Sequence, residues 1–220
     1  LDHFIRGTVR RISPEAPVPV VQVHTETHAP GGAGNVASNL SALGAAVSVF
    51  SVVGDDAAAR HLVGDLEERG VDISGIRRDP SRITTQKSRV VAEHQQVVRF
   101  DREPVRRLEP ADERHLLASL GEALPASSAL VLSDYGKGIV TSAVVRRALQ
   151  MARRAKVPVL VDPKIEHFRR YKGVDCMTPN LLEAAGGMHA TLPKDEETLI
   201  DLGRRILQTL RLRSVLITRG

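Results

Sequence analysis

Aromatic residues and cysteine are scarce in this chain, and long apolar runs are absent. Only 3% of the 220 residues are aromatic and none is Trp, so the stacking platforms on which single-stranded nucleic acids bind are few. Cys176 is the one cysteine; it cannot form an internal disulfide and lies in an apolar run, which favours a buried side chain over a catalytic thiol. No apolar run approaches the roughly 20 residues of a membrane-spanning helix, and no secretory signal pattern opens the sequence. These features predict a cytoplasmic protein that binds neither membrane nor nucleic acid.

The positive charge is spread along the chain. There are 31 Lys and Arg against 26 Asp and Glu, and the pI is about 9.8. Many arginines occur as pairs within helical patterns, namely Arg146-Arg147, Arg153-Arg154 and Arg204-Arg205. Such pairs are typical of solvated helix faces, and the excess charge fits small anionic ligands better than nucleic acid.

Apolar periodicity alternates between the spacing of strands and that of helices. Strands are predicted near residues 47–53, 129–133, 157–161 and 215–217, and helical spacing covers residues 58–66, 144–152 and 199–210. This alternation predicts an α/β fold with a parallel sheet covered by helices. Two stretches depart from it. Residues 18–23 predict an edge strand, because Pro17 precedes them and Pro19 lies among them. Residues 88–101 predict a hairpin around Glu93-His94-Gln95, so the two stretches could pair as a small separate sheet.

A glycine-rich turn, Pro30-Gly31-Gly32-Ala33-Gly34-Asn35, leads directly into a helical pattern. Glycines allow positive φ and close approach of a ligand, and the helix start offers free N–H groups to hydroxyls or anions. The alternative is an ordinary loop-to-helix turn, because glycine punctuation is common in α/β proteins. This stretch is the first candidate for a ligand site.

The order of several motifs carries a resemblance to a known family. They are Leu1-Asp2-His3-Phe4, residues 11–20 (RISPEAPVPV), the Gly31-Gly32 turn, Gly54-Asp55-Asp56, Lys87-Ser88-Arg89 with residues 95–101, residues 133–138 (SDYGKG), Asp162-Pro163-Lys164 and residues 178–183 (TPNLLE). The chain thereby resembles ribokinase-like (PfkB-type) sugar kinases, and more narrowly the D-glycero-β-D-manno-heptose-7-phosphate kinases. These are often the N-terminal half of a bifunctional heptose kinase/adenylyltransferase.

The resemblance implies a three-layer α/β fold with a mainly parallel central sheet and a small β lid. The lid strands would lie at about residues 6–25 and 84–101, and lids of this family tend to mediate homodimerisation. The implied reaction is ATP- and Mg²⁺-dependent phosphorylation of heptose 7-phosphate to the 1,7-bisphosphate, on the route to ADP-heptose and the lipopolysaccharide core. A fused adenylyltransferase is a possible partner domain.

The substrate residues follow from the same resemblance. Asp2 matches the family aspartate that accepts bonds from sugar hydroxyls, and Gly31, Gly32 and Asn35 match the turn that approaches the sugar. A phosphorylated sugar also needs fixed cations. We expect these to be Lys87 and Arg89, which alternate onto one face of the predicted hairpin, together with Arg11; the alternative is that all three are charges that protect sheet edges. Asp134 and Lys137 follow a predicted strand, where open α/β sheets bind ligands.

The nucleotide residues lie later in the chain. Asn180 and Glu183 match an Asn-x-x-Glu motif that serves ATP phosphates and reaches Mg²⁺ through water, although the same pair also predicts a helix capping box. Thr218 and Gly220 resemble the Thr-x-Gly segment that lines the ATP site. The family's catalytic aspartate lies in a Gly-Ala-Gly-Asp motif farther on, so we assign no catalytic residue within 1–220 and expect the base beyond Gly220. The chain is therefore expected to be part of a kinase domain, cut at both ends and inactive alone.

Two other functions remain open at this point. Another ribokinase-like sugar or nucleoside kinase would share the glycine turn and Asn180 but would not need Lys87, Arg89 and Lys137. A non-catalytic sugar-phosphate-binding module would share the fold without turnover. Were the base to lie within the chain, Asp134 and Asp162 would be the first candidates, because both follow predicted strands.

Overall fold

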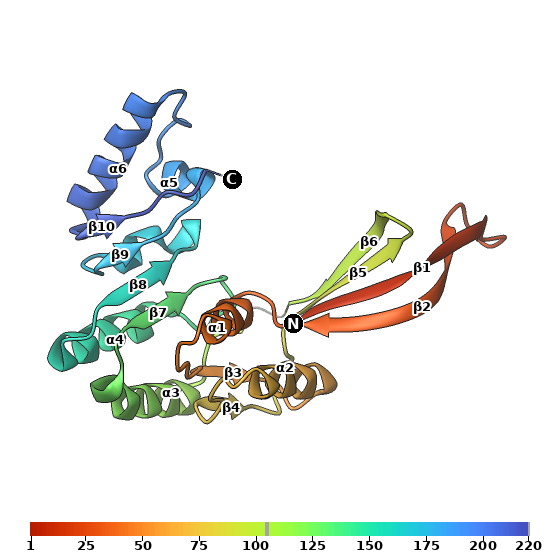
Figure 1. Ribbon diagram of the computed structural model, residues 1–220, viewed down its shortest axis with the longest axis horizontal. Helices are drawn as coiled ribbons and strands as arrows, with labels where there is room; N and C mark the ends of the chain where they lie inside the picture. The colour runs from red at the N-terminus through yellow and green to blue at the C-terminus, as the bar shows by residue number, and fades with distance from the viewer. Residues whose placement is uncertain (104–105, 220) are drawn as a thin grey trace. The chain divides into compact units, whose positions relative to one another are not determined.

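The computed structural model describes residues 1–103 and 106–219, and its internal contacts divide the chain into two compact units, residues 1–104 and 105–220 (Figure 1). The elements of each unit follow the predicted alternation of strand and helix. Each unit has a sheet of its own, and each is described by itself.

A four-stranded sheet, called here the hairpin sheet, dominates the first unit. It consists of two antiparallel hairpins, β1 (Asp2–Ile12) with β2 (Pro19–Ala29), and β5 (Gln86–Ala92) with β6 (Gln95–Arg102), joined by parallel pairing of β1 with β5. Figure 1 shows the two hairpins lying side by side. The predicted hairpin is confirmed, with Glu93 at φ 55° in its turn. The predicted pairing is corrected in one respect: residues 18–23 lie in β2 and reach the second hairpin only through β1, which overlaps the predicted lid region of about residues 6–25 but begins at Asp2.

The first unit also contains two helices and a short parallel strand pair. Helix α1 (Ala33–Ala42) follows the glycine turn, and α2 (Ala57–Glu68) begins at Asp56, whose side chain accepts the backbone N–H of Ala59 at 2.8 Å. Strands β3 (Ser51–Val53) and β4 (Ile76–Arg78) pair in parallel. The predicted strand 47–53 was too long, because its first half forms only an isolated bridge between Ser48 and Asp72.

Three stacked imidazoles attach α2 to the hairpin sheet. The ring of His28 on β2 lies between that of His3 on β1, at 4.4 Å between centroids, and that of His61 on α2, at 4.2 Å. Burial, followed by the neighbouring His61 and His3, lowers the pKa of His28. The stack therefore fixes the end of β1 that carries Asp2.

The second unit contains the predicted parallel sheet. Its strands are β7 (Leu130–Ser133), β8 (Val159–Asp162), β9 (Cys176–Met177) and β10 (Ser214–Val215), all parallel, in the order β10-β9-β8-β7. The helical elements of this unit are α3 (Pro110–Ala123), α4 (Ser142–Ala155), α5 (Leu181–Gly187) and α6 (Glu196–Leu210), with 3₁₀ turns η1 (Leu124–Ala126) and η2 (Ile165–Tyr171). All four strands end at one edge, where their following loops gather.

Helix α4 shows how the sequence produces this packing. The Thr141 side chain caps the helix by accepting the Val144 N–H at 3.1 Å, and Lys156 ends it in the left-handed conformation at φ 59°. One face is apolar and buried, made of Val144, Val145, Ala148, Leu149 and Ala152. Burying a Val or Leu side chain contributes about 1.5–3 kcal/mol, so this face holds α4 in place while its arginines remain at the surface.

No helix within residues 1–103 and 106–219 is long and apolar enough to cross a membrane.

Candidate active site

The hairpin sheet brings Asp2, Gly31 and Arg89 together. Asp2 opens β1 and Gly31 follows the end of β2, and β1 and β2 pair from Asp2 opposite Ala29. A Cβ on residue 31 would lie 2.7 Å from Oδ2 of Asp2, so only glycine allows this approach. The Arg89 guanidinium donates to Oδ1 of Asp2 at 2.7 Å from the parallel strand β5. These three predicted residues therefore form one cluster, with both side chains of the ion pair about one quarter exposed.

One face of the hairpin sheet is basic around this cluster. Lys87 pairs with Asp2 in the β1–β5 register, and its Nζ lies 3.6 Å from the Glu103 carboxylate. The guanidinium carbons of Arg6 and Arg89 lie 5.1 and 5.3 Å from the centroid of the Phe4 ring, within the range of cation–π attraction. The face thus combines the Asp2 carboxylate, which suits hydroxyls, with cations that suit an anionic group, and part of this positive charge is balanced by Glu103 beside Lys87.

Arg11 is not part of the cluster. It lies on β1 nine positions after Asp2, which in a strand is about 30 Å, and its side chain is exposed near the far end of the first hairpin. The substrate contact predicted for Arg11 receives no support from this placement within its own unit. The prediction missed that residues 2–12 form one continuous strand.

The glycine turn has the geometry that its sequence predicted. Gly32 has φ 53° and is the N-cap of α1, so a residue with a side chain would be strained at this point. The backbone N–H groups of Gly34 and Asn35 bond to the carbonyls of Gly31 and Gly32 at 3.1 Å. The Asn35 side chain is exposed in the first turn of the helix.

In the second unit, Asp134 is held inside the protein. Its side chain is 2% exposed and accepts bonds from the Gly136 N–H at 2.7 Å, His167 Nδ1 at 2.6 Å and the Tyr171 hydroxyl. Burial, together with the bond to Asp134, raises the pKa of Tyr171, which keeps its proton as donor. These contacts give Asp134 a positioning role for the loop after β7, in place of the direct substrate contact that was predicted.

The loop that Asp134 positions carries Lys137. Gly136 and Gly138 both have positive φ, at 68° and 83°, and shape this segment between β7 and α4. Lys137 is partly buried there, at the carboxyl end of β7 as predicted.

Asp162 offers a more open carboxylate at the same edge. It ends β8 and accepts a hydrogen bond from the Tyr135 hydroxyl at 3.1 Å. Burial is the main cause that raises the pKa of Asp162, and the charge of Asp134 adds to it. Burial and then the Asp162 charge raise the pKa of Tyr135 to about 12. Of the two carboxylates considered as candidate bases, Asp162 is the accessible one.

The residues predicted to bind the nucleotide lie together at the ends of β9 and β10. Asn180 Oδ1 accepts the Glu183 N–H at 2.9 Å, and Glu183 Oε2 accepts the Asn180 N–H at 2.9 Å, so the predicted capping box is present at the start of α5. Thr218 lies beside Asn180 through a parallel bridge, and its N–H bonds to the Pro179 carbonyl at 3.0 Å. Gly220, the last predicted residue, lies outside the described residues.

Among the residues that the structure describes, no cluster of three or more His, Cys, Asp or Glu side chains is arranged to hold a metal ion directly. Glu183 uses Oε2 in the capping box and is partly exposed. A single partly exposed carboxylate suits contact with Mg²⁺ through water, because Mg²⁺ keeps several of its waters in proteins.

Several neighbours of the predicted site residues were missed by the sequence analysis. Phe4 and Arg6 share the Asp2 face only because β1 is one strand, and His167 and Tyr171 reach Asp134 from 33 and 37 residues away. Alternation along residues 2–6 was the available clue for the first pair. No local pattern indicates the second.

Comparison with known proteins agrees with this arrangement. Residues 3–220 match the family described as pfkB family carbohydrate kinase, and the chain belongs to that family. It is 42% identical over 220 residues to "Bifunctional protein HldE" of Geobacter sulfurreducens, covering all of this chain and 45% of that protein. It is 46% identical over 184 residues to the protein of the same name from Wolinella succinogenes, covering 84% of this chain and 39% of that protein. The chain thus spans less than half the length of these relatives.

Solved structures share the fold at lower identity. Phosphofructokinase-2 from Escherichia coli, crystallised with fructose-6-phosphate, superposes with a TM-score of 0.76 and 21% identity over the whole chain and 71% of that protein. Ribokinase from Arabidopsis thaliana, complexed with ribose and ATP, gives a TM-score of 0.71 and 14% identity over the whole chain and 69% of that protein. The ribokinase-like α/β fold with a mainly parallel sheet is thereby confirmed.

Proposed function

We propose that the protein containing this chain transfers a phosphoryl group from ATP to D-glycero-β-D-manno-heptose 7-phosphate, giving the 1,7-bisphosphate for ADP-heptose biosynthesis. The observation that carries the proposal is the cluster of Asp2 with Arg89 and Lys87 on one face of the hairpin sheet. A carboxylate suits sugar hydroxyls, and fixed cations beside it suit a phosphate on the same sugar. The identity of 42% with a bifunctional HldE protein supports the same substrate class.

Phosphoryl transfer depends mainly on positioning and charge stabilisation. In the proposed reaction, Asp2 accepts bonds from sugar hydroxyls, the Gly31-Gly32 turn admits the sugar close to the backbone, and the hairpin sheet acts as a lid. Asn180, Thr218 and Glu183 face the nucleotide, with Glu183 holding Mg²⁺ through water. Mg²⁺ would neutralise charge on the ATP phosphates. Lys137 contacts the substrate from the loop that Asp134 holds.

The remaining parts of the proposal concern the whole protein. The relatives are about twice as long as this chain and are named bifunctional, which supports an adenylyltransferase domain fused to the kinase. ATP and a sugar phosphate as substrates favour the cytoplasm. The catalytic base is proposed to lie in the Gly-Ala-Gly-Asp motif of the family.

The test compares a phosphorylated with an unphosphorylated sugar. In the full-length protein, Lys87→Ala should raise the KM for heptose 7-phosphate about tenfold or more, because a hydrogen bond to a charged group contributes about 1.5–3 kcal/mol. The KM for ATP should stay nearly unchanged. Arg89→Ala should weaken binding of both heptose 7-phosphate and heptose, since Arg89 also holds Asp2. Initial-rate kinetics with both sugars give these values.

Arg60→Ala is the control, because it removes an exposed arginine of α2 without touching the cluster. If the unaltered protein phosphorylated heptose and heptose 7-phosphate equally well, the sugar-phosphate specificity would be wrong and a plain sugar kinase would be favoured. Binding of the sugar phosphate without any transfer from ATP would favour the non-catalytic module.

A further inference from the structure

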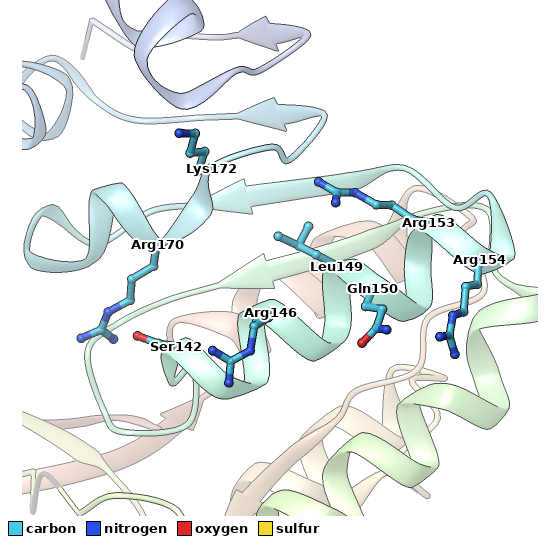
Figure 2. Close-up of a pocket in the computed structure, with 8 residues that line it drawn as sticks. All are labelled: Ser142, Arg146, Leu149, Gln150, Arg153, Arg154, Arg170 and Lys172. Atoms are coloured by element: carbon cyan, nitrogen blue, oxygen red, sulfur yellow. The ribbon is translucent and has the colours of Figure 1, made fainter.

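A basic depression lies along α4, away from the residues assigned above. It has a volume of about 740 Å³ and its lining contains five cationic side chains, those of Arg146, Arg153, Arg154, Arg170 and Lys172. Ser142, Leu149 and Gln150 complete the described lining, which includes no acidic residue. Figure 2 shows Arg146 of α4 and Arg170 of η2 extending toward the same end of the depression, near Ser142.

This concentration of charge differs from the rest of the chain. The sequence holds 31 Lys and Arg against 26 Asp and Glu, so the five cations of the depression equal the whole positive excess. Like charges on one helix face repel one another and weaken the helix slightly. The sequence analysis interpreted the arginine pairs as solvated helix faces. On such a face, acidic residues are expected among the basic ones.

The spacing of the cations suits an anion with more than one charged group. Arg146 and Arg153 are seven residues apart on α4, which places them on the same side of the helix about 10 Å apart along its axis. Arg170 and Lys172 belong to another segment, so the cations approach from two elements. A second depression shares Leu149 and Arg153 with the first and adds Arg211 and Arg213, but it also contains Asp175, which pairs with Arg213 at 3.2 Å. The anion site is therefore confined to the first depression.

Arg153 is also fixed in position. Its guanidinium donates to the Gly173 carbonyl at 3.2 Å, which ties the end of α4 to the loop after η2. The apolar face of α4 is buried, with Leu149 only 8% exposed at the base of the depression. The helix that carries Arg146, Arg153 and Arg154 is therefore held in place, which reduces the entropy lost on binding.

We propose that this depression is a second anion site, which binds a small molecule carrying two or more phosphate groups. Arginine forks bind phosphate oxygens in pairs, and no carboxylate in the described lining competes with such a ligand. Two sources share this chemistry, the polyphosphate tail of a nucleotide and a sugar with two separate phosphates. The site lies on the surface of α4, whereas Asp162 and Asn180 lie at the strand ends of the same unit.

The test measures anion binding and not catalysis. A negative result would therefore reject the second anion site without bearing on the proposed kinase function. Isothermal titration of the full-length protein would use inorganic tripolyphosphate in one arm and fructose 1,6-bisphosphate in the other. At least one should bind, and the double variant Arg146→Gln with Arg170→Gln should weaken that binding about tenfold or more. Tripolyphosphate binding alone would indicate a nucleotide tail, and fructose 1,6-bisphosphate binding alone would indicate a separated bisphosphate.

Arg147→Gln is the matched control, because it removes a neighbouring exposed arginine of α4 that is not in the described lining. Thermal melting would establish that each variant is folded. Hydrogen exchange should show ligand-dependent protection over residues 142–154 and 165–172 in the unaltered protein and in Arg147→Gln, but not in the double variant. Three outcomes would overturn the proposal. The first is that neither anion binds the unaltered protein. The second is that Arg147→Gln weakens anion binding as much as the double variant does, and the third is that ligand gives the unaltered protein no exchange protection over residues 142–154 and 165–172.

Discussion

The contact between Gly31 and Asp2 should be sensitive to a single methyl group. In Gly31→Ala the new Cβ would lie 2.7 Å from Asp2 Oδ2 and 3.1 Å from its Cγ, so the carboxylate must move away from its position beside Arg89. The displaced atoms belong to a side chain, so the free energy of unfolding should change little. The KM for the sugar should rise about tenfold or more, because Asp2 loses charge-assisted bonds. Steady-state kinetics and thermal unfolding of the full-length protein measure the two effects.

Gly64→Ala is the matched control. Gly64 lies inside α2, and a Cβ there would meet no atom within 4 Å. This change should leave the sugar KM unaltered and stabilise the protein by about 0.5–1 kcal/mol, since Ala is the better helix former. A normal sugar KM in Gly31→Ala would show that Asp2 does not contact the sugar.

Residue roles were predictable where a motif carried them. Gly31, Asp2 and Arg89 were named together from motif order, and the structure joins them although Asp2 and Arg89 are 87 residues apart. Asp134 was also named, but its burial and its donors His167 and Tyr171 depend on tertiary packing. The local sequence thus predicts that a carboxylate follows the end of a strand. Whether that carboxylate is exposed depends on residues that are distant in the sequence.

At the scale of elements, the packing of α5 on η2 leaves no room for a side chain at Gly187. A Cβ there would overlap the ring of Phe168, which is 1% exposed. Overpacking in a core costs about 1–3 kcal/mol, which exceeds the roughly 0.5–1 kcal/mol gained from Ala in a helix. Gly187→Ala should therefore lower the free energy of unfolding and, because α5 carries Glu183, raise the KM for ATP. Chemical denaturation and ATP kinetics would check this.

Gly64→Ala again provides the comparison, since it adds the same methyl group to a helix in open space. A Gly187→Ala protein as stable as Gly64→Ala would contradict the tight packing. If Gly187→Ala lowered the free energy of unfolding but left the KM for ATP unchanged, α5 would not be part of the proposed nucleotide site.

Elements with strong periodicity were predicted well and short ones were not. The pattern of α4 matches the helix closely, because five apolar positions face the core. Strand β9 was not predicted, because a strand of two residues is too short to show an alternating pattern. Strand β10 is equally short and was predicted at residues 215–217, one to two residues too late. Strand β1, whose start at Asp2 was not predicted, contains two register shifts against β2, between Arg6 and Gly7 and between Val9 and Arg11, which interrupt its alternation.

At the scale of the whole molecule, we propose that the protein forms a homodimer through the hairpin sheet. Val98 and Phe100 on β6 are 49% and 45% exposed and share one face of the strand, opposite to the face of Arg99. A lone apolar sheet face is poorly stable in water. Val98→Asp should convert a dimer of the full-length protein into a monomer, because burying an unpaired carboxylate in an interface is costly. Light scattering after size exclusion gives the mass.

Leu43→Asp serves as the control for surface charge, because Leu43 follows α1 and is 83% exposed outside the hairpin sheet. This variant should keep the mass of the unaltered protein. A monomeric unaltered protein, or a Val98→Asp protein that remains dimeric, would exclude this interface.

The strand pairing of the hairpin sheet also orders the events of folding. Its two antiparallel hairpins close short loops, of six residues between β1 and β2 and two between β5 and β6, so each can form within about 1–10 microseconds. The parallel pairing of β1 with β5 instead joins segments separated by α1 and α2, and such distant contacts form slowly. Asp2 lies on β1 and Arg89 lies on β5, so they come together only when these two strands pair. We therefore expect the Asp2–Arg89 cluster to be absent from partly folded chains, and the proposed affinity for a sugar to arise only when the parallel pairing of β1 with β5 has formed.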